Sequence, residues 1–588
     1  MKWDLSNIYT SFESAEFQKD LSELELGLAE FMEWVEENFS NDESTESKIA
    51  YFLERLNVLS LLASKLQAYA SLTLSADTNN ALAAQYLDII RKKMVNLSLL
   101  RVKLRRYLSA VDLDWELSTI QNVREHAFFL KEQKLLSKYL LSDAEEKVLS
   151  LMRLTGSNAW NNLYHKITSN LLCEIEVDGE IMKLPLMRVR NMAHEPSRQL
   201  REKAYFAELS ACEGIADTVA QCLNSIKGEF LTEVSLRGYE NPLQPMLMEN
   251  RITSETFNAM MEAVKESIPK LRNYLKLKAS ILGYEDGLPW YELLAPVGSF
   301  EKRWTFDEAR KYIVERLAEF SAELGVFVDG AFEKRWIDAE TRPGKRGGAF
   351  CTSIKALNES RILMSFDGTL ENVLTLAHEL GHAFHNYCLR NETFLNSTTP
   401  ATLAETASIF NEMLLIDRIK EEVVEPRQKI SVLEKELSDA VQVIVDIYSR
   451  YLFESEVFER RRRGPIGTAD LREIMIRAQK EAYGDGLNEK FLHPYAWVVK
   501  SHYYYPTFHF YNFPYTFGLL FALGVYAQKD EPGFFEKYKR LLASTGKGTA
   551  EEVAKNLGMD ITKKEFWKSS LRVIEEKINE FEVLSRSV

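Results

Sequence analysis

Apolar residues in the first 150 positions of the chain recur at helical spacing. Separations of four and three residues form a stripe on one side of a helix of about five turns, made of Phe17, Leu21, Leu24, Leu28, Phe31 and Val35. The same 150 positions contain no proline and a single glycine, Gly27, so little interrupts helix formation. We therefore predict long amphipathic helices whose apolar stripes pack in a core rather than contact a cofactor.

Two stretches break this helical pattern with the alternation typical of β-strands. Residues 173–184 alternate around Asp178-Gly179, a dipeptide favoured in two-residue hairpin turns. Residues 346–354 and 361–366 are β-prone runs separated by residues 355–360. This second pair leaves two interpretations open. A free strand edge could accept an extended peptide as a further strand, or the hairpin could serve only for packing.

The placement of proline suggests how the chain is divided. The first proline is Pro185, directly after the first hairpin, and helical periodicity resumes near Pro196. We expect a boundary near residue 200, which separates an N-terminal helical domain (residues 1–200) from a second domain (residues 201–588) that carries the candidate chemistry described below.

Composition narrows the class of protein. The 588 residues are 46% hydrophobic and 27% charged, which is ordinary for a globular protein, and the net charge of −14 argues against nucleic-acid binding. Asp4 and polar residues stand where a signal peptide would need an apolar run, and no stretch of about 18 apolar residues occurs. We predict a cytoplasmic protein with no membrane partner. The five cysteines form no CxxC pair, so we expect free thiols.

The motif His378-Glu-Leu-Gly-His382 places two imidazoles one helical turn apart, on one face, where both can reach a single ion. Glu379 lies about 100° further round the helix, so it can flank the metal without ligating it and act on water. Two ligands make half of a tetrahedral site, and a third is needed to separate a metal centre from a chance match.

The third ligand is predicted at Glu405, which lies among small and apolar neighbours where an unpaired carboxylate would be costly. His378, His382 and Glu405 form a His₂Glu set that leaves one position open, as catalytic zinc sites do. Glu412 is either a partner that orients a ligand histidine or an ordinary surface residue. His385 is interpreted as neighbouring structure, because a fourth protein ligand would close the site.

These residues resemble oligoendopeptidase F and, more distantly, thimet oligopeptidase, which are zinc metallopeptidases of one superfamily. The resemblance rests on Gly348-Ala-Phe-Cys, on residues 375–385 and on residues 403–412. It extends to Trp3-Asp-Leu-Ser-Asn-Ile-Tyr near the start and to residues 558–567 near the end, so it covers the chain effectively from end to end.

The resemblance implies a mainly α fold: an elongated multi-helix body with a deep central substrate channel and a small β-hairpin or sheet beside the HExxH helix. It implies one Zn²⁺ per chain on His378, His382 and Glu405, with Glu379 as general base, and short peptides as substrates. A late histidine and tyrosines face the substrate in the family. We assign them to His502, with His509 as the alternative, and to Tyr511 and Tyr515, although residues 510–518 match the family pattern only in part.

The function expected from these residues is zinc-dependent hydrolysis of internal peptide bonds in short oligopeptides. Two alternatives stay open. One is an exopeptidase that removes dipeptides from a C-terminus with the same chemistry. The other is a helical peptide-binding scaffold that holds zinc structurally, which the carboxylate of Glu379 and the missing fourth ligand argue against. The sequence does not indicate an oligomeric state.

Overall fold

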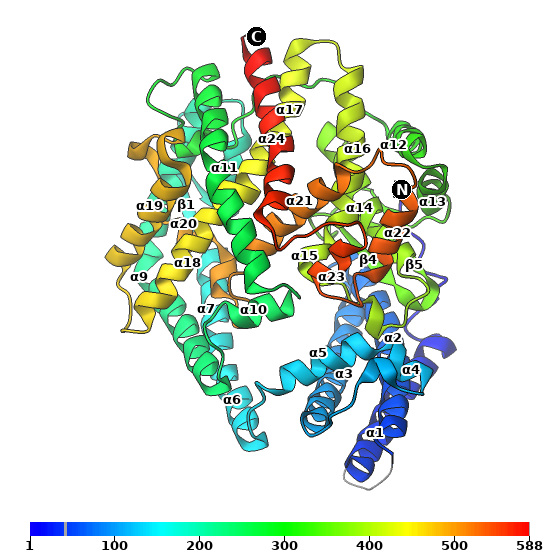
Figure 1. Cartoon of the computed structure of the whole chain (residues 1–588). Helices are drawn as coiled ribbons and strands as arrows, with labels where there is room; N and C mark the ends of the chain where they lie inside the picture. The colour runs from blue at the N-terminus through cyan, green and yellow to red at the C-terminus, as the bar shows by residue number, and fades with distance from the viewer. Residues whose placement is uncertain (40–43, 587–588) are drawn as a thin grey trace. The chain divides into compact units, whose positions relative to one another are not determined.

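The computed structural model describes residues 1–39 and 44–586 and shows a mainly helical protein with two small β-sheets (Figure 1). The expectation of a mainly α fold is confirmed. The chain forms two compact units, and each unit is built from three separate segments. Unit 1 contains Met1–Leu140, Lys302–Ile419 and Val525–Met559, and unit 2 contains Leu141–Glu301, Lys420–Gly524 and Asp560–Val588.

The division expected near residue 200 stays a prediction. In the structure, residue 200 lies three positions inside the 40-residue helix α9 (Arg198–Arg237), and no unit begins or ends there. Instead, the chain first passes from unit 1 to unit 2 after Leu140.

Unit 1 combines an N-terminal helical bundle with a three-stranded sheet and the helices around it. Its elements are α1 (Ala15–Asn38), α2 (Thr45–Ala76), α3 (Ala81–Ser109), η1 (Trp115–Leu117), α4 (Gln121–Glu125), α5 (Ala127–Ser137), α12 (Phe306–Phe320), α13 (Ala322–Glu333), β3 (Ile337–Asp338), β4 (Phe350–Ile354), η4 (Lys355–Leu357), β5 (Glu359–Leu363), α14 (Leu370–Cys388), η5 (Leu395–Ser397), α15 (Ala401–Ala404), α16 (Thr406–Glu422), α22 (Phe534–Ser544) and α23 (Ala550–Lys555).

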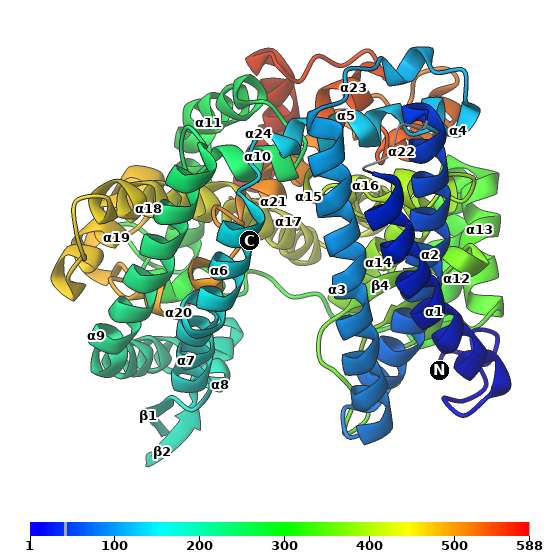
Figure 2. The same ribbon diagram turned by 90° about the horizontal axis from the view of Figure 1, so that it is seen from below.

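The predicted apolar stripe at the N-terminus lies on α1. Five of its six residues are buried and Leu21 is half-buried, so the stripe is core packing as expected. Ser14 caps the helix through a hydrogen bond that its Oγ accepts from the Phe17 amide at 3.3 Å. Helices α1, α2 and α3 run side by side (Figure 2) and share one apolar core.

The second predicted β region forms the sheet of unit 1, in the order β3-β5-β4. Strand β4 pairs antiparallel with β5, which pairs in parallel with β3, so β3 and β4 are the two edge strands. Helix α14 begins soon after β5, beyond Gly368, whose φ of 84° is in the left-handed region. A Cβ there would lie 2.3 Å from the Trp304 carbonyl oxygen, so only glycine fits this link between sheet and helix.

Unit 2 is built around long helices and one hairpin. Its elements are α6 (Asp143–Thr155), α7 (Ser157–Ser169), β1 (Leu172–Val177), β2 (Glu180–Pro185), α8 (Leu186–Asn191), η2 (Met192–His194), α9, α10 (Gln244–Glu249), α11 (Ser254–Ile281), η3 (Trp290–Glu292), α17 (Pro426–Val441), the π-helical segment η6 (Gln442–Asp446), α18 (Ile447–Arg461), α19 (Thr468–Tyr483), η7 (Gly484–Gly486), η8 (Glu489–Phe491), α20 (Ala496–Val499), η9 (Ser501–Tyr504), α21 (Phe513–Tyr526, which ends just inside unit 1) and α24 (Lys564–Ser585).

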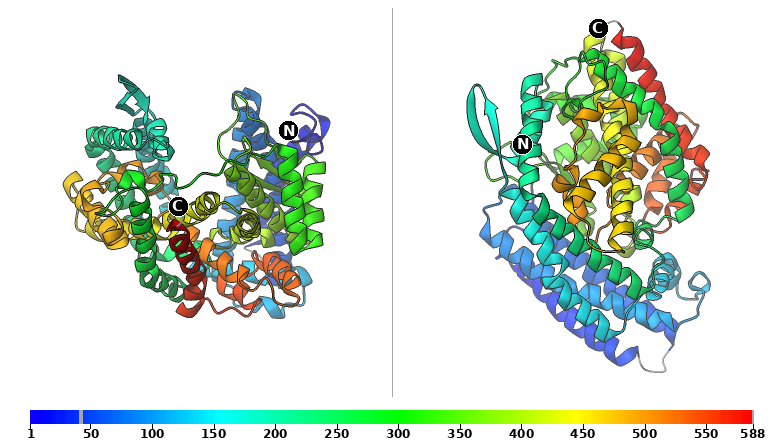
Figure 3. Two further views of the ribbon diagram at one scale, coloured as in Figure 1. Left: turned by 90° about the horizontal axis from the view of Figure 1, so that it is seen from above. Right: turned by 90° about the vertical axis from the view of Figure 1, so that its left-hand side faces the viewer.

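The first predicted hairpin is confirmed as β1 and β2, which project from the helices of unit 2 (Figure 3). Asp178 and Gly179 connect the strands with φ of 52° and 85°. Positive φ at both central residues is the requirement of a type I′ turn, which explains the Asp-Gly dipeptide.

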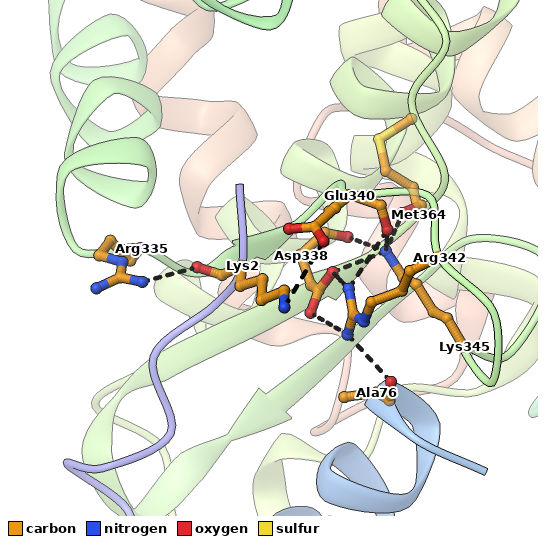
Figure 4. A network of polar contacts seen from close by, with 8 residues as sticks. All are labelled: Lys2, Ala76, Arg335, Asp338, Glu340, Arg342, Lys345 and Met364. Atoms are coloured by element: carbon orange, nitrogen blue, oxygen red, sulfur yellow. Dashed lines mark hydrogen bonds and ion pairs between the residues drawn. The ribbon is translucent and has the colours of Figure 1, made fainter.

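A buried ion-pair network fixes the segment between β3 and β4 (Figure 4). The Asp338 carboxylate accepts hydrogen bonds from both Nη atoms of Arg342, at 2.7 and 2.9 Å, and from Lys345 Nζ at 2.8 Å. The side chains of Asp338 and Lys345 are 1% and 2% exposed. Lys345 also donates to the Met364 carbonyl at 2.6 Å, which ties the segment to the end of β5. The network therefore fixes the position of the segment that leads into β4.

We expect Asp338→Asn to destabilise the protein by about 3–5 kcal/mol, because it leaves two cations without their carboxylate. The matched control is Glu340→Gln, which breaks an exposed pair with Lys2 at 3.6 Å and should cost less than about 1 kcal/mol. Urea denaturation measures both. An Asp338→Asn free energy of unfolding within error of the control would contradict the prediction.

The difference in free energy of unfolding between the wild type and Asp338→Asn should also depend on pH. Burial opposes the charged form of Asp338, but the hydrogen bonds from Arg342 and Lys345 outweigh it and hold its pKa below the usual value. A lowered carboxylate pKa stabilises the fold above the pKa of the unfolded chain, about 3.9. The difference between the wild type and Asp338→Asn should therefore be constant near neutrality and shrink as the pH falls through the pKa of the folded state.

No helix in the described ranges 1–39 and 44–586 is long and apolar enough to cross a membrane.

Candidate metal centre

Helix α14 and the junction between α15 and α16, all in unit 1, bring the three predicted ligands together. His378 and His382 project from α14, with ring centroids 5.0 Å apart, and Glu405 lies between α15 and α16. Glu405 Oε2 is 3.3 Å from His378 Nε2 and 3.4 Å from His382 Nε2. The predicted trio is the one cluster of three such side chains within the described residues whose ligand atoms all lie within 4.8 Å of one another.

These distances fit a zinc ion. Ligand atoms about 2.0–2.1 Å from zinc at tetrahedral angles are separated by about 3.3–3.4 Å, which matches both nitrogen–oxygen distances above. The donor set, two imidazole nitrogens and one carboxylate oxygen, is also one that zinc prefers. Three protein ligands leave a fourth position for water or substrate.

Gly381 explains how α16 comes close enough to supply Glu405. A Cβ on Gly381 would lie 2.4 Å from the Ala407 carbonyl oxygen and 2.6 Å from Ser408 Cα, closer than any side-chain carbon can approach. The two helix backbones are therefore in contact at the middle of the HExxH motif. Any larger residue at this position would push α16, and Glu405 with it, away from the histidines.

Neighbouring side chains orient the ligands. His378 Nδ1 lies 3.3 Å from Glu412 Oε2, so of the two interpretations of Glu412 the geometry favours the orienting partner. Ser408 donates a hydrogen bond from Oγ to Glu405 Oε2 at 2.8 Å. The sequence analysis missed Ser408, although its position three residues after a ligand, one helical turn away, was a signal for it.

His385 has a partner outside the ligand set. Its Nε2 lies 2.9 Å from Thr545 Oγ1, from the segment before α23, and the ring is buried. The structure thus gives His385 a partner of its own, in agreement with its interpretation as neighbouring structure.

Glu379 lines a cavity of about 390 Å³ together with the three ligands. Its side chain is buried, and Oε2 has no hydrogen-bond partner among the described residues. Burial raises the pKa of Glu379 to about 7. The edge strand β4 and the residue before it supply another wall, through Ala349, Cys351 and Ser353. A buried, unpaired carboxylate thus faces the same space as the ligand atoms.

The electrostatics of the ligands are those of a site prepared for a cation. Burial opposes the charged form of His378, but Glu405 and Glu412 outweigh it and raise its pKa to about 10. Burial lowers the pKa of His382 to about 4. Burial also opposes ionisation of Glu405, yet the histidines hold its pKa at about 2. Without a metal, one proton on His378 compensates the carboxylates, and a metal cation would displace it.

The remaining predicted site residues lie in unit 2. The rings of His502 and Tyr511 are 4.9 Å apart, and the Tyr515 hydroxyl donates to that of Tyr511 at 3.3 Å. Tyr511 precedes α21 by two residues, so Tyr515 alone is on the helix. His509, the alternative to His502, is buried with its ring 3.8 Å from that of Phe230. His502, Tyr511 and Tyr515 form one cluster, and their approach to substrate stays a prediction.

Comparisons with known proteins identify similar chains. Residues 315–573 match the model for "Peptidase family M3" and residues 114–171 match the model for "Oligopeptidase F", together more than half of the chain. An oligoendopeptidase F homologue from Lactococcus lactis subsp. lactis is 26% identical over 602 residues, which cover 99% of this chain and 97% of the relative.

Solved structures share the fold. A putative peptidase from Chlamydophila abortus superposes with a TM-score of 0.83 at 22% identity, covering 99% of this chain and 98% of that one. Oligoendopeptidase-F from Enterococcus faecium gives a TM-score of 0.70 at 19% identity, covering 97% and 99%. At these low identities, the structural similarity supports the fold alone. The family relationship rests on the sequence matches to the two family models and to the Lactococcus homologue.

Proposed function

Because the chain belongs to peptidase family M3, in its oligoendopeptidase F branch, we propose that it is a zinc-dependent endopeptidase that hydrolyses internal bonds of short peptides. One observation carries the proposal: a buried carboxylate without a hydrogen-bond partner, Glu379, shares a cavity with a His₂Glu ligand set. A structural zinc site would need a fourth protein ligand and no free carboxylate.

His378, His382 and Glu405 would hold one zinc ion per chain, and Glu412 and Ser408 would keep two of these ligands in orientation. When bound, zinc acts as a Lewis acid that polarises the scissile carbonyl and makes water more acidic. Glu379 Oε2 accepts the proton from the attacking water, and the same carboxyl group then donates it to the leaving nitrogen. The burial of Glu379 keeps other donors from competing for this oxygen.

Strand β4 can position the substrate. It is one of the two edge strands of its sheet, and residues on it line the cavity beside Glu379. A peptide in extended conformation could pair with the free edge, which would align one peptide bond with the ligand set and leave side chains pointing alternately away from the sheet. This favours the first of the two interpretations of the second hairpin. His502, Tyr511 and Tyr515 are proposed to contact the substrate as oxyanion donors.

We also propose that the protein has a deep substrate channel, accepts only short peptides and is cytoplasmic. The exopeptidase alternative uses the same ligand set and differs in how the substrate ends are recognised. The scaffold alternative is disfavoured by the free carboxylate of Glu379.

Cleavage of an internally quenched peptide of about ten residues, blocked at both ends, tests the proposal. We expect internal cleavage, identified by mass spectrometry, that disappears with a zinc chelator and returns when zinc is added, because the water needs the Lewis acid. The unblocked peptide is the control. Release of dipeptides from its C-terminus with no cut in the blocked peptide would support the exopeptidase. No cleavage of either peptide by protein that holds one zinc would support the scaffold.

A further inference from the structure

Unit 2 contains a second cavity that the peptidase proposal does not use. Its volume is about 280 Å³, close to the lower limit of small-molecule pockets, about 300 Å³. Residues of α8, α9, η3 and α20 form its walls, all from unit 2. Aromatic side chains, among them Tyr205, Trp290 and Tyr291, line the cavity together with the polar residues Arg190, His493 and Lys500.

His493 is a buried polar residue that lines this cavity with one ring nitrogen, Nδ1, left without a partner among the described residues. Its backbone is fixed by Gln479, which donates to the His493 carbonyl at 2.9 Å and accepts from its amide at 3.0 Å. The side chain is only 2% exposed. Nε2 lies 3.3 Å from Glu208 Oε1, whereas Nδ1 has no hydrogen-bond partner among the described residues. A buried polar group left unpaired is costly unless it serves a ligand.

Basic side chains outnumber acidic ones on the wall of the cavity, where Arg190, Arg201 and Lys500 lie with Glu208. Three carboxylates lie on or next to its wall, and each already has an arginine partner: Glu208 with Arg190 at 3.1 Å, Glu292 with Arg201 at 2.6 Å, and Asp446 with Arg450. Lys500 shares Asp446 with Arg450, and its Nζ lies 3.5 Å from Asp446 Oδ2. Burial lowers the pKa of Lys500 to about 8. An anion in the cavity would compensate this ammonium group.

We propose that this cavity binds a small organic carboxylate with an apolar side chain, such as an N-acylated amino acid or the C-terminal residue of a short peptide. The carboxylate would lie against Lys500 Nζ, with His493 Nδ1 and Arg190 as further donors. The aromatic walls would contact the apolar body. This site is separate from the metal ligands, and the proposal does not depend on the peptidase function.

Calorimetric titration with N-acetylphenylalanine and with its amide tests the proposal on the whole protein. The two probes differ in the carboxylate alone. We expect saturable binding of the acid and a Kd for the amide that is about tenfold higher or more, because a charge-assisted hydrogen bond is lost. Equal binding of the two probes, or no saturable binding of the acid at millimolar concentration, would overturn the proposal.

Substitutions test whether N-acetylphenylalanine binds in this cavity. Lys500→Met keeps the apolar stem and should weaken binding of the acid by about tenfold or more. Lys183→Met is the matched control: it removes an exposed lysine of β2, paired with Glu174 at 2.9 Å, and should leave the Kd unchanged. His382→Ala, at the metal centre, should also leave it unchanged. Loss of binding in His382→Ala, or wild-type binding in Lys500→Met, would place the acid elsewhere and overturn the proposal.

Two further measurements complete the test. If Lys500→Met does not fold, a crystal structure of the wild type with N-acetylphenylalanine decides, since the carboxylate must lie within hydrogen-bond distance of Lys500 Nζ. An acetylated tripeptide that ends in phenylalanine distinguishes the sources of the carboxylate. Binding as tight as that of N-acetylphenylalanine supports a peptide C-terminus, and binding of the single residue alone supports a free N-acylated amino acid.

Discussion

Glu379→Gln should retain zinc and substrate binding and lose about 10²- to 10⁴-fold in kcat, the range that general acid–base catalysis contributes. The substitution keeps the shape of the side chain and adds a donor where Oε2 now has no hydrogen-bond partner among the described residues. The amide cannot take up the water proton, while the ligands His378, His382 and Glu405 are unchanged. Each tenfold loss corresponds to about 1.4 kcal/mol of transition-state stabilisation. Cleavage of the blocked peptide and zinc content measured on the same sample test both halves of the expectation.

The matched control is Glu371→Gln, which makes the same chemical change in the exposed first turn of the same helix, α14. It should cleave the blocked peptide at close to the wild-type rate, because this side chain does not line the cavity. Glu379→Gln protein that holds one zinc ion and turns over at the wild-type rate would exclude Glu379 as the general base.

His382→Ala should lose the metal and all measurable hydrolysis. Removing a ligand should weaken zinc binding by well over 100-fold, since loss of an outer partner alone costs about 10- to 100-fold. Glu412→Gln, which changes the partner of His378 Nδ1 and keeps all three ligands, should fall within that smaller range. Zinc affinity measured by competition with a chelator of known strength ranks the variants.

His385→Gln is the control for the loss of an imidazole near the site. His385 is one turn beyond His382 and is paired with Thr545, so its replacement should leave the zinc stoichiometry at one per chain. Glutamine can still reach Thr545 with a polar group. If His385→Gln lost zinc and His382→Ala kept it, the ligand assignment would be wrong.

The parts of the structure that could be predicted from the sequence are those governed by local spacing. The stripe on α1 follows the helical period, and the β1–β2 turn follows from Asp178-Gly179, whose backbone requirement few other residues meet. The pair His378 and His382 shares a face because it lies on one helix. Glu405 could be predicted because a carboxylate among apolar residues must be compensated by a partner.

What escaped prediction depends on residues that are distant in sequence. The glycine inside the HExxH motif, Gly381, is where α16 touches α14, a contact that sequence spacing does not reveal. The roles of Ser408 and Glu412 depend on how α16 is rotated against α14. Arg342 and Lys345 both bind the buried carboxylate of Asp338, a contact that no pattern in the sequence indicates. These contacts are determined by packing between segments that are distant in the sequence.

The three-segment construction of each unit has a consequence for synthesis on the ribosome. Unit 1 takes its final segment from Val525–Met559, and unit 2 takes its own from Asp560–Val588, which includes α24, packed on α11 and α17. The α1–α3 bundle can form early, because its contacts are local in sequence. Unit 1 lacks its final segment until Met559 has been made, and unit 2 needs residues from Asp560 onward, so the His385–Thr545 contact beside the metal ligands forms late. The proposed metal ligands are therefore synthesised well before the segment that packs beside them, and the surroundings of the site can be completed only after that segment has folded back.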